Sequence, residues 1–484
     1  MNREMKRLGI VVIAMFMALF LSTSFIQVIY ADELNNDARN SRTLYDSYNV
    51  ERGSILVDGI PIASSSPVNS NYSFMRKYEF GELYAPITGY YTINQGITGL
   101  EAELNSYLSG TDSGRFLDRI QEIITGQPLQ GGTVELTLDH EVQQAAWDAL
   151  GDRKGAVVAY DPVTGKILAL VSKPSYDPNL LTSHNSKEVI QNYETLLNDP
   201  DAPLINRAIG GDLYWPGSVF KLVVMAAALE SGKYTANSVF PNPISYQLPN
   251  SSYEVRNGSR TTCGPGETVT LIEALRLSCN IPFVELGIEL GPEALRAASE
   301  SYGFGRELSI PLTVTPSSFP AELDAAQTGL VSFGQYDVKV TPMQMAMVSA
   351  AIANNGVQMK PYLVERILSP SLTLLSQTEP EAYSRPNTPA VAEELTRMMV
   401  NNVSNGIASG AAINGVDVAG KTGTAETGRP AIQHLWFTGF APANNPKVAI
   451  AVVVEHNIVE QPSATSNSVA APIAKKVMEA VLKQ

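Results

Sequence analysis

The clearest pattern of apolar and polar positions is an uninterrupted apolar run near the N-terminus. Residues 8–30 carry no charged side chain, and the basic residues Arg3, Lys6 and Arg7 precede them. A helix needs about 20 apolar residues to cross a bilayer, so this run predicts a transmembrane anchor. A cleaved signal peptide is the alternative, but its apolar region normally spans only about 7–15 residues. The basic residues predict that residues 1–7 lie in the cytoplasm and the bulk of the chain outside.

Beyond the predicted anchor, the chain divides into a polar stretch, residues 31–131, and a longer region, residues 132–484, that contains both helix and strand patterns. Residues 31–131 contain several Asn and Ser clusters, and we expect a small pedestal domain there rather than a loosely ordered linker. Residues 132–484 leave room for a large second domain. Within it, residues 367–389 are rich in Ser, Pro and Thr and predict a surface excursion. Residues 470–482 have helical spacing and predict a closing helix.

A second apolar run, residues 219–229, predicts a helix buried in a large core. Ser218 opens this run after the turn residues Pro216-Gly217, and Lys221 interrupts its apolar surface. Residues three apart share a helix face, so the lysine amine should lie beside the serine hydroxyl. A buried lysine loses the solvation of its charge and can act as the base that activates a serine. The alternative is a chance serine near a lysine that extends to the surface.

A short polar pattern, Ser278-Cys279-Asn280, ends another predicted helix at residues 270–278. A hydroxyl and an amide two positions apart suit proton relay and a hydrogen bond to a substrate amide. Alternatively, Ser278 and Asn280 only cap local backbone groups. The place of this pattern between the two others favours the functional interpretation.

The third pattern opens a predicted antiparallel meander near the C-terminus. It consists of four consecutive residues: Lys421, Thr422, Gly423 and Thr424. Two strand-like runs follow at residues 434–441 and 447–456, joined by the turn signal of residues 442–446. A glycine in a strand lets a ligand backbone approach, and a cation with two hydroxyls suits a carboxylate. The alternative is a generic strand that opens with polar residues.

In this order, the three patterns resemble those of class B penicillin-binding proteins, in particular the penicillin-binding protein A group. The resemblance extends along nearly the whole chain. Further segments that are similar to this family are residues 52–59, 136–146, 155–169, 341–346 and 436–442. One departure stands out, because the family often has Gly-Gln-Gly where this chain has Gly334-Gln335-Tyr336. We expect Tyr336 to alter a loop and to leave the class unchanged.

The resemblance implies an α+β fold, in which the penicillin-binding and β-lactamase-like domain has an antiparallel sheet flanked by helices. It also implies the catalytic roles. Ser218 is the acylated nucleophile and Lys221 takes its proton. Ser278 relays protons toward the leaving amine, Asn280 holds the substrate peptide, and Lys421 sets the electrostatic field around Ser278.

The strand residues have implied roles in substrate binding. Thr422 and Thr424 bind the terminal carboxylate of the substrate, while Gly423 allows close approach. The backbone N–H groups of Ser218 and Thr424 form an oxyanion hole, a site where losing one donor costs roughly 3 kcal/mol.

The activity implied by the resemblance is D,D-transpeptidation of peptidoglycan stem peptides, with β-lactams acylating the same serine. Lipid-linked precursors and a polytopic glycosyltransferase in the membrane are the implied partners. A D,D-carboxypeptidase would use the same site with water as the acceptor. A β-lactam sensor or a non-catalytic scaffold is the alternative from another class, but a sensor would need further membrane helices or a cytoplasmic domain.

Composition narrows the possible partners and cofactors. The net charge of −14 argues against nucleic acid as a partner. The four histidines show no metal-ligand spacing, and no phosphate-binding glycine loop occurs, so we expect neither a metal nor a cofactor. The two cysteines, Cys263 and Cys279, could form a disulfide outside the cell or remain as two buried thiols.

Residues 194–198 read Glu-Thr-Leu-Leu-Asn and match a pattern with which class A β-lactamases position a hydrolytic water. In those enzymes the pattern lies between the second and third motifs, whereas here it precedes Ser218. The order argues against lactamase activity, and we expect Glu194 on a solvated helix near the cleft.

Overall fold

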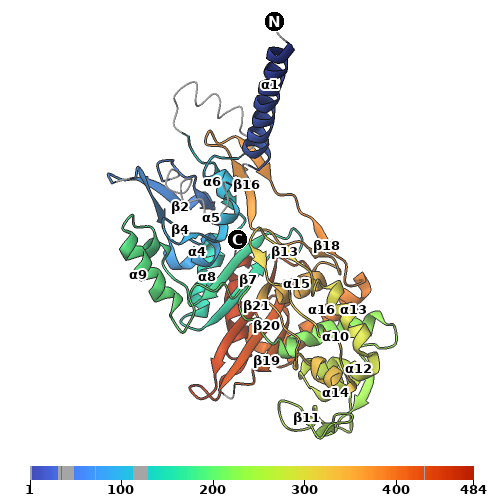
Figure 1. The fold of residues 1–484 in the computed structure, drawn as a ribbon. Coiled ribbons are helices and arrows are strands. Elements are labelled where there is room, and N and C mark those ends of the chain that lie inside the picture. Colours follow the sequence, from blue (N-terminus) through green and yellow to red (C-terminus); the bar gives the residue numbers. More distant parts are fainter. Residues whose placement is uncertain are drawn as a thin grey trace.

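The computed structural model describes residues 3–30, 34, 48–70, 72–112, 129–429 and 431–483. An N-terminal helix extends away from a body built around two larger sheets, one near that helix and one further from it (Figure 1). The fold combines antiparallel strands with packed helices, as the α+β prediction requires.

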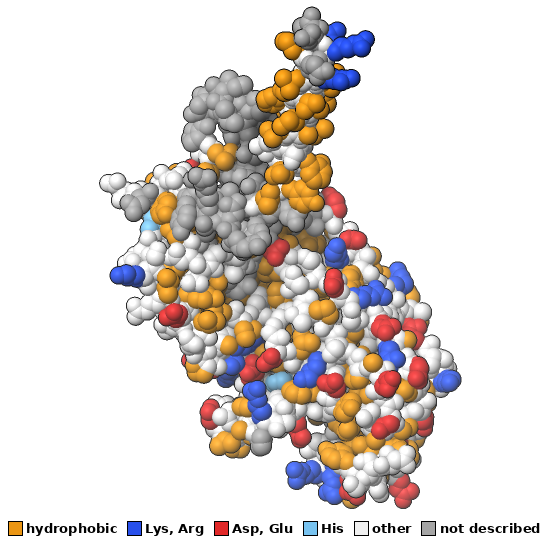
Figure 2. All heavy atoms as spheres, in the orientation of Figure 1, with side chains coloured by type: hydrophobic (Ala, Val, Ile, Leu, Met, Phe, Trp, Pro, Cys, Tyr) orange, Lys and Arg blue, Asp and Glu red, His pale blue; other side chains and the backbone are white. Residues whose placement is uncertain are grey.

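The N-terminal helix α1 spans Arg3–Ser24 and continues as a π-helical turn over Phe25–Ile29. Met5–Ile29 has a mean hydropathy of 2.4, and none of its most apolar window is buried in the protein. Apolar side chains cover the helix, with basic side chains toward its free end (Figure 2). Its length and composition are sufficient to cross a membrane, as the sequence predicted, and fit a single-pass membrane protein.

The sheet nearer α1 has six strands in the order β17-β16-β6-β1-β2-β3. Their bounds are β17 Leu374–Gln377, β16 Val364–Leu368, β6 Thr133–Leu136, β1 Ile55–Val57, β2 Ile60–Pro67 and β3 Phe74–Tyr78. Strands β1 and β6 pair in parallel, and the other pairs are antiparallel. Strands from two distant parts of the sequence therefore share one sheet.

The segment predicted as a surface excursion, residues 367–389, contains strand β17 and the short strand β18. All four residues of β17 are exposed, in agreement with a surface position. However, β17 pairs with β16, and β16 pairs with β6 of the N-terminal sheet. The segment therefore also forms the edge of that sheet.

A buried ion-pair network includes one residue of this sheet, Arg76 of β3. Glu101 is fully buried, and its two carboxylate oxygens each lie 2.6 Å from a guanidinium Nε, of Arg52 and of Arg76. Burial opposes the charge of Glu101, but Arg76 and Arg52 together hold the pKa of its carboxyl below the ordinary value. The network thus joins β3 to the segments before β1 and around α5 (Gly99–Glu103).

The second sheet has five antiparallel strands in the order β19-β20-β21-β7-β8. Their bounds are β19 Ala419–Glu426, β20 Ile432–Ala441, β21 Val448–Asn457, β7 Gly155–Tyr160 and β8 Ile167–Lys173. The predicted meander over residues 434–441 and 447–456 is confirmed as β20 and β21. The helices α17 and α8 pack together beside this sheet, and α15 packs against β20, β21 and β7.

The remaining elements complete the two regions. The helices and 3-10 turns are α4 Gly81–Thr88, α6 Asn105–Leu108, α8 His140–Leu150, η3 Pro178–Leu181, α9 Ser186–Leu197, η4 Gly217–Phe220, α10 Lys221–Glu230, α11 Leu271–Arg276, α12 Ile281–Leu290, α13 Pro292–Ser301, α14 Ala325–Val331, α15 Pro342–Ala353, α16 Pro389–Asn405, η5 Ser409–Ala411 and α17 Ala470–Leu482. The short strand pairs are β4 Tyr91–Thr92 with β5 Gly96–Ile97, β9 Val239–Pro241 with β12 Thr268–Thr270, β10 Ser245–Gln247 with β11 Glu254–Arg256, β13 Leu308–Ser309 with β14 Thr313–Val314, and β15 Gln358–Met359 with β18 Ala382–Ser384.

Helix α10 occupies the centre of the helical region, in contact with α12, α13 and α16. Seven of its residues are buried, including Lys221, so the prediction of a core helix at 219–229 is confirmed. Helix α9 carries Glu194, which is exposed as expected. The expected position of this helix near the cleft is wrong, because Val189 belongs to a buried apolar cluster with Ala85 and Tyr90 on the N-terminal side of the molecule (Figure 1).

Candidate active site

Ser218 lies in the 3-10 turn η4, directly before α10, and its side chain is half-buried. Gly217 has a φ of 54°, and its N–H donates to the Gly334 carbonyl at 2.9 Å. A Cβ atom at Gly217 would lie 2.4 Å from the Thr424 carbonyl oxygen. Glycine is therefore required here on two grounds, since only glycine adopts this φ freely and fits against β19. The turn presents Ser218 at the edge of the sheet.

The Lys221 amine is completely buried at the start of α10. It donates to the carbonyl oxygens of Ser278 at 2.9 Å and Cys279 at 2.8 Å, and to Asn280 Oδ1 at 2.8 Å. Burial, with a smaller contribution from the charge of Lys421, lowers the pKa of this amine well below its ordinary value. The sequence predicted that the side chains of Ser218 and Lys221 would lie side by side. In the described structure, no hydrogen bond joins them.

The Lys421 amine comes from the opposite wall, on β19, and is also completely buried. It donates to Ser278 Oγ at 2.6 Å and to the Thr422 carbonyl at 2.9 Å. Burial lowers the pKa of Lys421 to about 7. Two amines with depressed pKa values thus contact one segment, Lys221 through the Ser278 carbonyl and Lys421 through the Ser278 hydroxyl.

The Ser278-Cys279-Asn280 segment lies between α11 and α12, so α11 ends two residues earlier than the predicted helix. Ser278 has a φ of 55°, a left-handed conformation that is strained for a residue with a side chain. The Asn280 amide donates through Nδ2 to the Arg256 carbonyl, and its backbone N–H donates to Asn257 Oδ1, both at 2.9 Å. Tertiary contacts, rather than local preference, hold this conformation.

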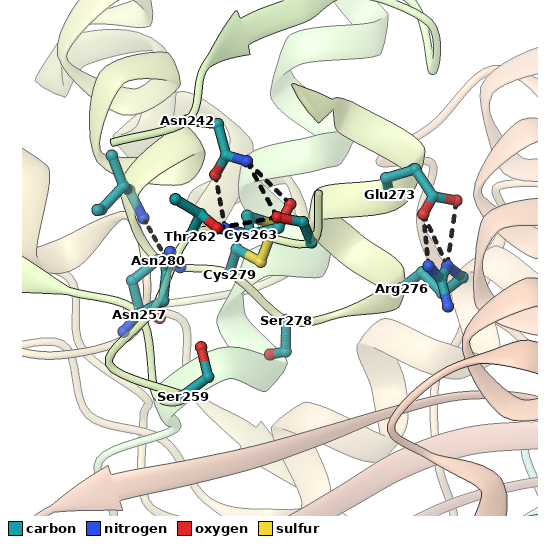
Figure 3. Close-up of a disulfide and its surroundings, with 12 residues drawn as sticks. Asn242, Asn257, Ser259, Thr262, Cys263, Glu273, Arg276, Ser278, Cys279 and Asn280 are labelled. Atoms are coloured by element: carbon teal, nitrogen blue, oxygen red, sulfur yellow. Dashed lines mark hydrogen bonds and ion pairs between the residues drawn. A yellow bond between two sulfur atoms is a disulfide. The ribbon is translucent and has the colours of Figure 1, made fainter. Parts of the chain in front are cut away.

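Cys263 and Cys279 are joined by a disulfide, which decides between the two alternatives that the sequence left open. The bridge ties the second motif to the loop before β12, while the Ser278 side chain points away from it (Figure 3). Asn242 supports the loop, since its Oδ1 accepts from the Cys263 N–H at 2.6 Å. One of the two carbonyls that accept from Lys221, that of Cys279, is thus on a covalently anchored residue.

The third motif occupies β19, and its residues lie in different environments. A Cβ atom at Gly423 would lie 2.9 Å from the Val219 nitrogen, so this glycine admits the serine-bearing turn. The Thr422 hydroxyl is buried and has no hydrogen-bond partner in the described structure. Thr424 is exposed, and its hydroxyl lies 2.8 Å from Ser466 Oγ. Ser466 was missed by sequence reasoning, because it is an ordinary loop serine 42 positions away in the chain.

Tyr336 lies on the loop after α14 and is 43% exposed. Its φ is 66°, in the left-handed region where the glycine common in the family would be unstrained. The Tyr336 carbonyl accepts from Trp215 Nε1 at 2.6 Å, which fixes this loop beside the turn that leads to Ser218. Because this bond uses the backbone carbonyl, it does not depend on the tyrosine side chain, and the expectation that Tyr336 alters the loop stays a prediction.

Residues 155–479 match the family model described as the penicillin-binding protein transpeptidase domain, more than half of the 484 residues. The chain belongs to the penicillin-binding protein transpeptidase family. Residues 52–134 match a second model, the penicillin-binding protein A dimerisation domain. The resemblance to class B penicillin-binding proteins of the penicillin-binding protein A group is therefore confirmed.

Relatives of known name are similar over the full length. The chain is 41% identical to peptidoglycan D,D-transpeptidase PbpA of Mycolicibacterium smegmatis, with 100% of both chains covered. It is 42% identical to the protein of the same name from Mycobacterium tuberculosis, covering 100% of this chain and 99% of the relative.

Solved structures of a family member show the same fold. The ceftriaxone acyl-enzyme complex of penicillin-binding protein A from M. tuberculosis aligns with a TM-score of 0.87 and 41% identity, covering 90% of this chain and 100% of that one. Its penicillin G acyl-enzyme complex aligns with a TM-score of 0.85 over the same shares. These β-lactam complexes belong to a protein of this family with the same domain arrangement.

Proposed function

We propose that this protein is a peptidoglycan D,D-transpeptidase that acts through an acyl-Ser218 intermediate and is acylated by β-lactams. The observation that carries this proposal is that the turn bearing Ser218 packs against β19, while the buried amines of Lys421 on that strand and of Lys221 both contact Ser278. The full-length relatives named peptidoglycan D,D-transpeptidase support the same reaction.

In the proposed acylation step, Ser218 Oγ attacks the penultimate D-Ala carbonyl of a stem peptide, and its proton passes to Lys221. The lowered pKa of Lys221 favours the neutral amine that this step needs. An amine with one free lone pair can donate only two protons, so Lys221 must release one of its three present acceptors to act as the base. The acceptor most easily released is Asn280 Oδ1, because a substrate amide N–H can replace Lys221 as the donor to this side chain.

The collapse of the tetrahedral intermediate breaks the C–N bond to the terminal D-Ala. The leaving amine needs a proton, and Ser278 is placed to supply it, because its oxygen accepts from Lys421 and its own proton remains available. The proton that Lys421 offers to Ser278 Oγ then replaces the one that is lost. In the second step, a neighbouring stem-peptide amine attacks the acyl-serine carbonyl and gives up a proton through Ser278 to the now neutral Lys421. Lys221 returns its proton to Ser218 Oγ as the ester C–O bond breaks, which completes the cross-link and frees Ser218.

The strand β19 is the proposed binding edge for the donor peptide. The backbone N–H groups of Ser218 and Thr424 form the proposed oxyanion hole, and the contact of Gly217 with the Thr424 carbonyl supports their proximity. Thr422 and Thr424 are the proposed hydroxyl ligands of the terminal carboxylate, and Asn280 holds the peptide from the opposite side.

Residues 8–30 are the proposed anchor, with residues 1–7 in the cytoplasm and the catalytic region outside; the apolar α1 and its basic N-terminal end support this orientation. Residues 31–131 are the proposed pedestal and residues 132–484 the proposed transpeptidase domain. Lipid-linked precursors and a polytopic glycosyltransferase are proposed partners, because the anchor would hold the enzyme where new glycan chains emerge.

Fluorescent penicillin labelling of the full-length chain in detergent tests the proposal. We expect stable labelling of the wild type and of Ser252→Ala, an exposed control, but none of Ser218→Ala. Incubation with polymerised glycan strands should then yield cross-linked muropeptide dimers from the wild type. Release of D-Ala without dimers would replace the transpeptidase by a carboxypeptidase, and an unlabelled but folded wild type would contradict the acyl-serine site.

A further inference from the structure

Ser466, a serine outside the three motifs, makes two hydrogen bonds with the third. It lies between β21 and α17 and is only 4% exposed. Its Oγ is 2.5 Å from the Gly423 carbonyl oxygen and 2.8 Å from Thr424 Oγ1. The Ser466 carbonyl accepts from the Ala471 N–H at 2.9 Å in the first turn of α17. The closing helix therefore holds Ser466 against the substrate-binding strand.

Counting protons decides the direction of these two hydrogen bonds. A hydroxyl carries one proton, and a carbonyl oxygen carries none. Ser466 must therefore donate to the Gly423 carbonyl and has no proton left for Thr424. The short contact between the two hydroxyls then requires Thr424 to be the donor and Ser466 the acceptor. The Thr424 hydroxyl consequently presents only lone pairs to the exposed side of the strand.

This direction matters because a carboxylate is acceptor-only and needs donors. The nearby Thr422 hydroxyl is buried and without a partner in the described structure, so its proton is uncommitted. The Thr424 proton, in contrast, is committed to Ser466 in the free enzyme. The two threonines of the motif are thus not equivalent toward an anionic ligand.

We propose that Ser466 is a positioning residue that sets the hydrogen-bond direction of Thr424, so that a ligand carboxylate must compete with Ser466 for the Thr424 proton. This proposal rests on the proposed function and adds a residue that regulates carboxylate recognition at the same site. Thr422 supplies the uncontested donor, and Ser466 limits the contribution of Thr424.

Acylation of the full-length chain in detergent by penicillin G and by its methyl ester tests this proposal. Both ligands use the same serine and oxyanion hole, so the ratio of their second-order acylation rate constants isolates carboxylate recognition. We expect Ser466→Ala to raise the acid-over-ester ratio roughly five- to tenfold, because a freed hydroxyl can donate a charge-assisted hydrogen bond. The acylation rate constant of the methyl ester by itself reports any loosening of β19, because the ester has no carboxylate to be recognised.

Three variants serve as controls. Ser466→Thr keeps the hydroxyl and should show the wild-type acid-over-ester ratio. Ser468→Ala, at an exposed serine of the same loop, should also leave this ratio unchanged. Adding Thr424→Val to Ser466→Ala should remove the increase. An unchanged or lower ratio in Ser466→Ala, or an increase that survives Thr424→Val, would overturn the proposal.

Thr424→Val alone gives an independent test should Ser466→Ala fail to fold. It should change the ratio by less than about twofold, because the lost proton was already engaged. A larger fall would show that Thr424 donates to the carboxylate despite Ser466. Wild-type protein that neither ligand acylates would contradict the proposed function itself, whereas acylation with unaltered ratios in every variant would contradict only the role of Ser466.

Discussion

At the residue scale, the two buried amines, of Lys221 and Lys421, differ in their hydrogen-bond partners, and the roles that we propose for them follow from this difference. The hydrogen bonds that Lys221 makes in the described part of the chain all go to the Ser278–Asn280 segment, so the neutral amine needed for the proposed proton abstraction requires one of them to break. Lys421 donates to the hydroxyl of Ser278, the group that we propose protonates the leaving amine. The charge of Lys421 also disfavours the charged form of Lys221. The charge of Lys421 therefore influences the protonation of Lys221.

The pH dependence of acylation tests this coupling. Only neutral Lys221 accepts the serine proton, so the acylation rate should rise with pH through the lowered pKa of Lys221. Positive Lys421 lowers that pKa, so removing its charge in Lys421→Met should move the rise to higher pH. The measurement is the midpoint of the penicillin acylation profile between pH 5 and 10, which is independent of the overall loss of rate. A midpoint that stays fixed or falls would show that the amines titrate independently.

At the element scale, the segment between α11 and α12 carries the second motif in a strained backbone conformation. The Cys263–Cys279 disulfide, the Asn257 side chain and the Lys221 amine all hold this segment. Such strain persists only where surrounding contacts determine it. The disulfide is the covalent member of this set, and its removal leaves the weaker contacts to maintain the conformation of Ser278.

The double variant Cys263→Ser with Cys279→Ser measures what the bridge contributes. A disulfide that closes a loop of 16 positions should stabilise the fold by about 3 kcal/mol, mainly by restricting the unfolded chain. We therefore expect a lower thermal midpoint and slower acylation by fluorescent penicillin. Mild reductant should reproduce both effects in the wild type and leave the double variant unchanged. Full acylation rate with a lowered midpoint would show that the bridge stabilises the fold without positioning Ser278.

At the scale of the whole molecule, a single charged network connects the strands nearest the anchor. Glu101 is enclosed with Arg52 and Arg76, and all three side chains are at least 95% inaccessible to solvent. Burying these charges is costly, and the compensation comes from their mutual contacts. The network therefore makes the N-terminal sheet sensitive to the loss of any one member.

Glu101→Gln should leave two buried guanidinium groups without a counter-charge and lower the free energy of unfolding by about 3–5 kcal/mol. Thermal melting of the full-length chain in detergent would report this loss, with Glu103→Gln, an exposed neighbour, as the control. Because the network is distant from β19, the fraction of variant that remains folded should still be labelled by fluorescent penicillin. A melting curve that matches the wild type would refute the structural role of this carboxylate.

The sequence by itself determined the class of fold, the apolar N-terminal helix, the core helix after Ser218 and the meander that begins with Lys421. These features follow from local information, since hydrophobic runs, turn residues and short motifs are encoded within a few consecutive positions. The disulfide remained one of two alternatives, because a cysteine spacing carries no geometry.

Only the tertiary structure decided which distant groups meet. It paired β16 with β6 across the sequence, placed α9 away from the helical cleft and turned Lys221 toward the carbonyls of Ser278 and Cys279 rather than toward Ser218. It also brought Ser466 to Thr424, although neither the loop nor its serine has a distinctive pattern. Such contacts depend on packing and on the need of buried polar groups for partners, which no local stretch of sequence specifies.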